Sequence, residues 1–243
     1  MAIKILAYNS KGGVGKTTTI WAIGSCLAAI GLNTLITDID FQGHQATAFG
    51  LEQEDSLGAY LNGQISFDEA IVNARPNLDL IRTDFAINEV WDSFPSEIIR
   101  YKFALIEHRY QYILFDSNPG MNRLTRSAAE FVDYIIAPVN LEFLAIKGVG
   151  TLQKVLDKEF DKKFLGVIPC KHDLRTKRTL EILDVLKEIF KDKLSPPVRV
   201  NNDIDKAQNL GLTLMEHDPL CNGAQDYLEV TRWVIQNVKQ KKN

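Results

Sequence analysis

The residues with the clearest chemistry lie in one short segment, "SKGGVGKTT", near the start of the chain. Its glycines let backbone N–H groups approach phosphate oxygens closely, and the apolar helix expected after them adds the positive end of its dipole. Lys16 is spaced to reach the β- and γ-phosphates of ATP, and the Thr17 hydroxyl to ligate Mg²⁺. The segment therefore predicts a phosphate-binding loop. Its expected ATP-binding residues are Gly12, Gly13, Val14, Gly15, Lys16, Thr17 and Thr18.

Acidic residues follow two further apolar segments. "DIDFQGHQA" begins with Asp38 and Asp40, which are two apart and so share one face of an extended strand. "YILFDSNPG" is an apolar strand that ends in Asp116, the pattern of a Walker B acid that holds Mg²⁺ through water. Together with the loop, these acids predict a site for Mg²⁺ and ATP.

A second lysine, Lys11, stands ahead of the glycines. With it, "KGGVGKTT" resembles the deviant Walker A motif of the ParA/MinD ATPases. In that family the first lysine reaches across a two-fold interface to the phosphates bound by the partner. The resemblance implies an ATP-dependent homodimer in which Lys11 binds ATP and acts catalytically in trans, beside Lys16 of the receiving subunit.

The acidic segments extend this resemblance. "DIDFQ" is similar to the family's D-x-D-P-Q segment, which implies that Asp40 positions the attacking water and that Asp38 supports the magnesium shell. Phe41 replaces the usual proline, His44 the usual asparagine, and Asn118 the first proline of a D-x-P-P segment after Asp116. The metal-site residues expected on these grounds are Thr17, Asp38 and Asp116.

The resemblance runs from Ile3 to about Val234. It includes a segment after the next strand in which Glu142, Phe143, Ala145 and Gly148 match. Only nine residues precede Ser10, so we expect one P-loop domain over 1–243 without an N-terminal helix-turn-helix extension, as in short Soj-like members. The implied function is partition of plasmids or chromosomes, with a ParB-like or other adaptor protein that stimulates ATP hydrolysis.

Non-specific DNA binding through basic residues is also implied by the family. The richest basic cluster is "KHDLRTKR", whose D-x-R-T segment resembles a loop of these proteins, and such residues bind phosphates in a salt-dependent way. Asp203 stands where a family arginine contacts DNA. The alternative for the cluster is a solvated charged helix. The expected DNA-binding residues are Lys171, Arg175, Lys177, Arg178, Arg199 and Lys206.

Two alternative functions use the same ATPase. A MinD-like protein would bind a membrane surface through its last helix, where Tyr227, Val230, Val234 and Val238 have helical spacing beside Trp233. A packed last helix explains these residues equally well, so we expect a membrane to be the less favoured partner. A ParA-like protein that positions a protein organelle would keep the DNA-binding dimer and change the cargo.

Composition agrees with a cytoplasmic protein, and the family resemblance implies that it is nucleoid-associated. The net charge is −3 and the pI is about 5.9, so any DNA-binding surface must be local. Three widely spaced cysteines fit neither a disulfide framework nor a zinc site. The N-terminus has no signal-peptide pattern, and no window is apolar enough to span a membrane.

The elements that must position these residues alternate between short apolar strands and helices. We expect a doubly wound, mostly parallel α/β sheet flanked by helices, with the site at the carboxyl ends of the strands. The expected strands are 3–9, 33–40, 78–83, 110–116, 133–139, 164–169 and 197–200. The expected helices are 16–30, 95–108, 122–131, 143–158, 175–192 and 224–238.

Overall fold

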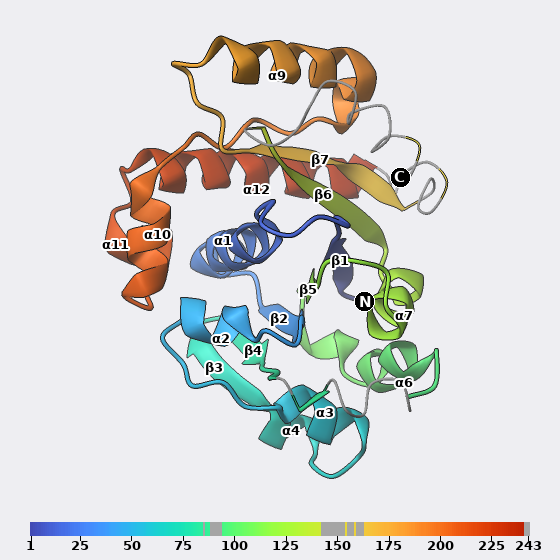
Figure 1. The fold of residues 1–243 in the computed structure, drawn as a ribbon. Coiled ribbons are helices and arrows are strands. Elements are labelled where there is room, and N and C mark those ends of the chain that lie inside the picture. Colours follow the sequence, from blue (N-terminus) through green and yellow to red (C-terminus); the bar gives the residue numbers. More distant parts are fainter. Residues whose placement is uncertain (85, 88–93, 142–153, 155–157, 159–162, 241–243) are drawn as a thin grey trace.

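A seven-stranded, mostly parallel sheet forms the centre of the protein in a computed structural model (Figure 1). The structure describes residues 1–84, 86–87, 94–141, 154, 158 and 163–240. The strand order is β3-β4-β2-β5-β1-β6-β7, and only β3 runs antiparallel to its neighbour. The strands are β1 (Ile3–Ala7), β2 (Thr34–Ile39), β3 (Ile71–Arg75), β4 (Leu78–Ile81), β5 (Tyr112–Ser117), β6 (Tyr134–Asn140) and β7 (Phe164–Cys170).

Helices cover both faces of this sheet (Figure 1). The helices of the described residues are α1 (Lys16–Ala29), α2 (His44–Ala48), α3 (Ser56–Leu61), α4 (Phe67–Ala70), α6 (Ile98–Ala104), α7 (Arg123–Phe131), α9 (Lys177–Phe190), α10 (Asn202–Asn209), α11 (Leu214–His217) and α12 (Asn222–Gln240). Two 3₁₀ turns, η2 (Glu107–Arg109) and η3 (Lys191–Lys193), follow α6 and α9.

The strands are apolar on both faces because each face packs against helices. Along β1, Ile5 packs with α1 and α12, whereas its neighbour Leu6 packs with α6 and α7 on the other side. In β5, Leu114 and Phe115 divide between the two clusters in the same way. This alternation confirms the predicted doubly wound arrangement.

Two strand predictions need correction. β3 was not predicted: it is an antiparallel edge strand that pairs with β4 through a register shift between Asn73 and Arg75. Residues 197–200 do not form a strand: they make an isolated bridge between His172 and Arg199, with backbone hydrogen bonds that join Val198 and Val200 to the end of β7 and to His172. The physical reason is that Pro196 and Pro197 offer no N–H groups to a ladder.

The helix predictions hold where the structure describes the chain, with shorter bounds except for the last helix, which is longer than the predicted 224–238. The expected helix over 95–108 is α6 followed by η2, separated by a short turn. The expected helix over 143–158 lies outside the described residues except at 154 and 158, and so do Glu142, Phe143, Ala145 and Gly148. Within the described residues, no helix is both long and apolar enough to cross a bilayer.

Candidate nucleotide site

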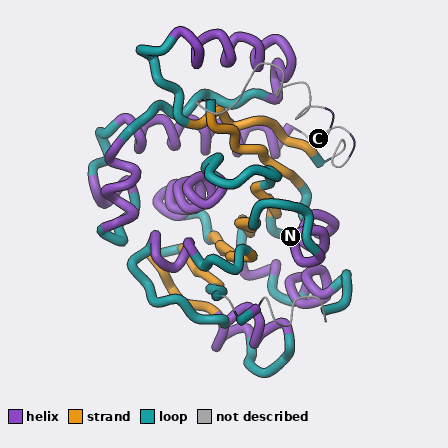
Figure 2. Tube along the Cα trace, viewed as in Figure 1, coloured by secondary structure: helices purple, strands orange, loops and turns teal. Residues whose placement is uncertain are grey.

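The predicted phosphate-binding loop joins the carboxyl end of β1 to the start of α1 (Figure 2). Gly13 and Gly15 have φ angles of 68° and 100°, in the left-handed region that favours glycine. Gly15 is the N-cap of α1, and its carbonyl accepts a hydrogen bond from the N–H of Thr19 at 2.9 Å. The loop therefore ends as the first turn of a helix, the geometry that binds phosphate groups.

Lys16 is buried, with 6% of its surface exposed. Its Nζ donates to the backbone oxygen of Lys11 at 3.2 Å. Burial lowers the pKa of the Lys16 amine, and the carboxylates of Asp116 and Asp40 oppose this shift. Lys16 is therefore held beside both acids and inside its own loop.

Lys11, in contrast to Lys16, lies at the surface. Its backbone N–H donates to Oδ1 of Asn9 at 3.1 Å, and Asn9 in turn donates to the Pro138 carbonyl at 2.8 Å. The Lys11 residue is exposed, and its ammonium makes no hydrogen bond or ion pair with any residue that the structure describes. A buried asparagine thus fixes the backbone at this lysine while the charged group extends into solvent.

The acids meet because β2 and β5 are neighbours in register. Asp38 pairs directly with Asp116 across the two strands, and both are almost completely buried. Burial raises the pKa of both carboxyl groups, that of Asp116 to about 6, and their mutual repulsion adds to the shift at Asp38. Both oxygens of Asp38 accept backbone N–H groups at 3.0 Å, from Asp40 and Gln45.

The donor set around Asp116 fits a magnesium ion. Oδ1 of Asp116 is buried and accepts no hydrogen bond of regular geometry from the described residues, although the Thr17 side chain lies close enough to lower the Asp116 pKa. Oxygen ligands of this kind are those that Mg²⁺ prefers. No group of three His, Cys, Asp or Glu side chains in the described part of the chain is placed to hold a metal, so phosphate and water oxygens would have to complete the shell.

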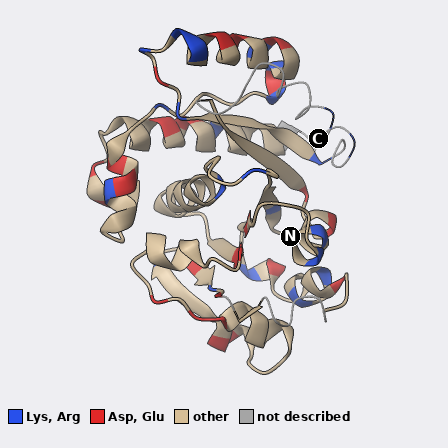
Figure 3. Cartoon of the chain, in the orientation of Figure 1, with Lys and Arg blue, Asp and Glu red and all other residues tan. Residues whose placement is uncertain are grey.

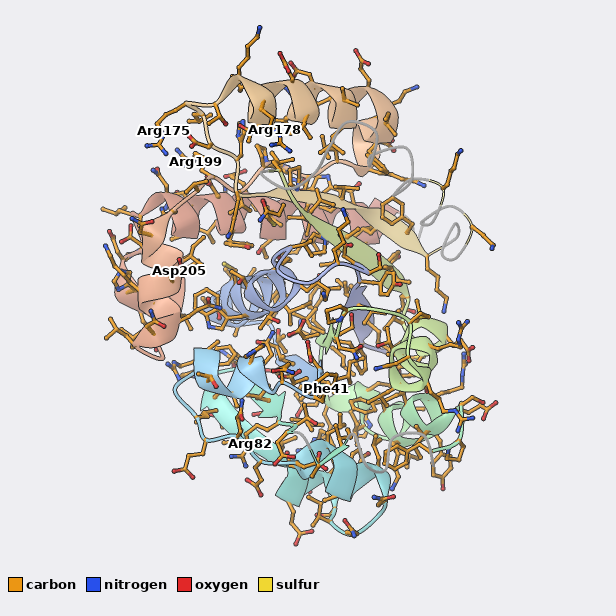
Figure 4. All side chains as sticks on the ribbon, viewed as in Figure 1. Phe41, Arg82, Arg175, Arg178, Arg199 and Asp205 are labelled. Carbon is orange, nitrogen blue, oxygen red and sulfur yellow. The ribbon has the colours of Figure 1, made fainter. Side chains whose placement is uncertain are left out.

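A cleft of about 640 Å³ opens over the loop and contains the predicted ATP-binding residues from Gly12 to Thr18. Asp40 borders it and accepts the N–H of Gln42 at 3.1 Å. Half-buried Phe41, the next residue in the chain, also lines the cleft and is labelled in Figure 4. Lys16, Thr17 and Asp40 therefore share one cavity.

The opposite wall of the cleft was not predicted from the sequence. It is formed by the end of β7, by the start of α10 with the segment before it, and by α12. These elements are seen together in Figure 1. The sequence analysis assigned Lys171 and Arg199 to DNA and gave the other wall residues no role, because segments far apart in the chain bring them together. The wall residues are Cys170, Lys171, Val198, Arg199, Val200, Asn201, Asn202, Ile204, Asp205 and Tyr227.

Four of the predicted DNA-binding residues form ion pairs with acids. Arg175 pairs with Asp173, and Arg199 makes two short contacts with the largely buried Asp226, at 2.6 Å and 2.9 Å. The other two pairs are Lys177–Glu181 at 3.7 Å and Lys206–Asp203 at 2.9 Å. The predicted DNA-binding residues therefore lie among acidic residues, and Figure 3 shows both signs of charge on α9 and α10.

The predicted DNA-binding residues do not lie together in one patch. In Figure 4, Arg175, Arg178 and Arg199 lie toward α9, and Asp205 marks the separate helix α10 that carries Lys206. Lys171 and Arg199 line the nucleotide cleft itself. Arg175 and Arg178 are exposed and lie away from the cleft lining.

Helix α12 is the helix through which a MinD-like protein would bind a membrane. Tyr227, Val230, Val234 and Val238 are each at most 1% exposed and pack in the cluster that contains α1. Their helical spacing is thus explained by the core of the protein.

Residues 2–194 match a protein family described as an AAA domain. The sporulation initiation inhibitor protein Soj of Bacillus subtilis is 32% identical, over 96% of this chain and 99% of Soj. The chain belongs to the ParA/MinD family of partition ATPases. Another relative in the ParA/MinD family, the chromosome partitioning protein ParA of Caulobacter vibrioides, is 29% identical over 98% of this chain and 96% of its own length.

A solved structure of the ParA/MinD family shares the fold. The septum site-determining protein MinD of Pyrococcus horikoshii, in complex with Mg-ADP, superposes with a TM-score of 0.80 and covers 99% of both chains. Its sequence identity to this chain is 21%. The likeness shows that the sheet order and helix layers described above are those of this fold.

Proposed function

We propose that this member of the ParA/MinD family is a Mg²⁺-dependent ATPase whose nucleotide cycle switches a homodimer on and off DNA. The observation that carries the proposal is the convergence of Lys16, Thr17, Asp40 and Asp116 on one edge of the sheet, where the cleft opens over the P-loop. The same edge exposes Lys11. A cleft that only stored a nucleotide would need no acid at Asp40 and no free lysine at its rim.

Each residue has a distinct role in this proposal. The N–H groups of the loop from Gly12 to Thr17 bind phosphate oxygens, and Lys16 turns to the β- and γ-phosphates. Thr17 and Asp116 hold Mg²⁺, which offsets the negative charge of the phosphates when it is bound. Asp40 orients the attacking water, and Asp38 fixes the loop between Asp40 and Gln45 through its two backbone hydrogen bonds.

Lys11 completes the site of a second copy of the chain. Its ammonium has no partner among the described residues, so it is free to reach another subunit's phosphates. A charge supplied in trans makes hydrolysis depend on dimer formation, as an arginine finger does in other P-loop proteins. The nucleotide would therefore control assembly.

In the proposed cycle, DNA is the surface to which the ATP-bound dimer attaches. The ATP-bound dimer binds the nucleoid without sequence preference through the exposed basic residues near α9, and hydrolysis releases it. A ParB-like or other adaptor stimulates hydrolysis and couples the cycle to a plasmid, a chromosome or a protein organelle. We propose that the whole chain acts as one domain in this cycle.

The assembly step is tested with Lys11→Ala and with the matched exposed lysine variant Lys187→Ala, on the far end of α9. Light scattering with ATP, ADP or no nucleotide reports the mass. We expect wild type and Lys187→Ala to dimerise only with ATP, and Lys11→Ala to stay monomeric while it still binds ATP. Dimers of Lys11→Ala that match wild type would contradict the role in trans.

DNA binding is tested by fluorescence anisotropy with a random-sequence DNA duplex. We expect ATP-dependent, salt-sensitive binding by wild type and a loss of roughly tenfold or more when Arg175 and Arg178 are both changed to Ala. Arg126→Ala on α7, an exposed arginine on another face, is the matched control. ATP-dependent binding to vesicles of anionic phospholipid without DNA binding would support the MinD-like alternative instead.

A further inference from the structure

Gln45 contacts every residue of the proposed magnesium site. It lies in α2 just beyond the acidic segment and is completely buried. Its backbone N–H donates to Oδ2 of Asp38 at 3.0 Å. Its side-chain Nε2 donates to Oδ2 of Asp116 at 3.0 Å and to the backbone oxygen of Thr17 at 2.9 Å. One side chain thus ties together the ends of β2 and β5 and the first turn of α1.

The orientation of the Gln45 amide follows from its partners. The Asp116 carboxylate and the Thr17 carbonyl only accept hydrogen bonds, so both must face the NH₂ group rather than Oε1. Oε1 is then left on the other side of the amide. It is buried and accepts no hydrogen bond from the residues the structure describes.

A second oxygen in the same place is also without a donor. Oδ1 of Asp116 is buried and accepts no hydrogen bond of regular geometry from the described residues, although the Thr17 side chain lies near the carboxylate, while Oδ2 is held by Gln45. Buried acceptors without donors are costly, and a native protein normally supplies a partner for each. Water molecules bound to Mg²⁺ are strong donors and would satisfy both oxygens.

We propose that Gln45 is the positioning residue of the magnesium site: it holds one oxygen of Asp116 so that the other faces the ion, and its own Oε1 accepts a hydrogen bond from a metal-bound water. The inference deepens the proposed Mg²⁺–ATP function and rests on it. Residues that orient metal ligands in this way alter metal affinity strongly even though they do not touch the ion.

The chemistry of the position favours a neutral amide. Asp38 and Asp116 are buried side by side, so a third carboxylate at position 45 would add repulsion in the absence of metal. An apolar side chain would leave the Asp116 oxygen and the Thr17 carbonyl without the donor they share. Glutamine supplies donor and acceptor on one uncharged group.

The test measures Mn²⁺ binding to the ADP complex of the full chain by electron paramagnetic resonance of the free ion. Gln45→Met keeps the length of the side chain and removes its donors, and Gln64→Met makes the same change at an exposed position. We expect Gln45→Met to weaken Mn²⁺ binding roughly tenfold. ADP binding in EDTA should change less than twofold, and Gln64→Met should match wild type in both assays.

Gln45→Glu supplies a second readout through the rise in Tm that Mn²⁺ causes in the ADP complex. The added carboxylate should enlarge that rise relative to wild type, whereas Gln45→Met should reduce it. The proposal is overturned if Gln45→Glu and Gln45→Met change the Mn²⁺-induced rise in Tm in the same direction. It is also overturned if a folded Gln45→Met variant binds Mn²⁺ as wild type does. If Gln45→Met does not fold, Gln45→Glu is compared with Gln64→Glu, and equal Mn²⁺-induced rises in Tm in these two variants overturn the proposal. Failure of wild type to bind Mn²⁺–ADP would instead overturn the proposed function.

Discussion

Alanine at position 15 is a direct test of the phosphate-loop geometry. Gly15 has a φ angle of 100°, and an L-residue in the left-handed region costs about 1–2 kcal/mol. An added Cβ would also lie 3.3 Å from Sγ of the buried Cys170, which is a tight contact. Crowding in a packed interior typically adds about 1 kcal/mol. We therefore expect Gly15→Ala to reduce the free energy of unfolding by about 2–3 kcal/mol.

Two neighbouring glycines serve as graded controls. Gly13 has a φ angle of 68° but no heavy atom within 4 Å of an added Cβ, so Gly13→Ala should cost only the backbone strain, about 1–2 kcal/mol. Gly12 does not have a positive φ, and its Cβ would meet Pro119 at an ordinary 3.7 Å. Gly12→Ala should therefore change the stability by less than about 0.5 kcal/mol.

The assay is urea unfolding without nucleotide and with EDTA, with the slope of the transition compared between variants. A double-mutant cycle with Cys170→Ala isolates the contact, and we expect the double variant to lose about 1 kcal/mol less than the sum of the single changes. Equal costs at positions 12 and 15 would refute the loop geometry. Strict additivity with Cys170→Ala would refute the contact.

Two further predictions concern the acid beside the loop and a buried histidine. Asp40→Ala should slow ATP turnover by roughly a hundredfold or more and let ATP-bound dimers accumulate, measured by phosphate release and light scattering; unchanged turnover would contradict its role. The buried His172 has a pKa below its usual value because burial disfavours the imidazolium, so the unfolded chain takes up a proton that the native chain does not as pH falls below about 6.5. His172 should therefore lower the free energy of unfolding as pH falls from 7.5 to 5.5, whereas the raised pKa values of Asp38 and Asp116 act in the opposite direction in both wild type and His172→Gln. Over this range the change in the free energy of unfolding should therefore be more favourable in His172→Gln than in wild type; equal changes would contradict this.

The strands that build the site were predictable because they are buried on both faces. "IKILA" and "YILFDS" are nearly continuous apolar runs, and each lies between two other strands of the sheet. β3 has no such pattern: "IVNAR" is half-exposed at the sheet edge and follows a four-residue helix without a break. The apolar alternation of 197–200 was misleading because Pro196 and Pro197 have no N–H group, so the pairing of Val198 and Val200 cannot extend toward the N-terminus into a full strand.

The predicted site residues on the P-loop side of the cleft come from segments that continue from strand ends, so local motifs were sufficient to find them. Gln45 was missed because its importance depends on the pairing of β2 with β5, which the residues around it do not encode. Arg199 was expected to face DNA, but Asp226, 27 positions further along the chain, binds its guanidinium. Pairings between distant segments of this kind depend on tertiary packing.

The hydrogen bond from Lys16 to the carbonyl of Lys11 gives the loop an internal competitor for anions. An entering ligand must displace a neutral backbone oxygen from the ammonium. The bond from the ammonium to the carbonyl already involves one charged group, and a phosphate adds a second charge and its Coulomb attraction, whereas water or a neutral molecule offers only another neutral acceptor. The loop therefore discriminates by charge before any base or sugar is recognised. In the proposed dimer, the same exchange releases the Lys11 carbonyl while Asn9 still holds the Lys11 N–H, so the lysine offered to the other copy keeps one backbone anchor when a nucleotide arrives.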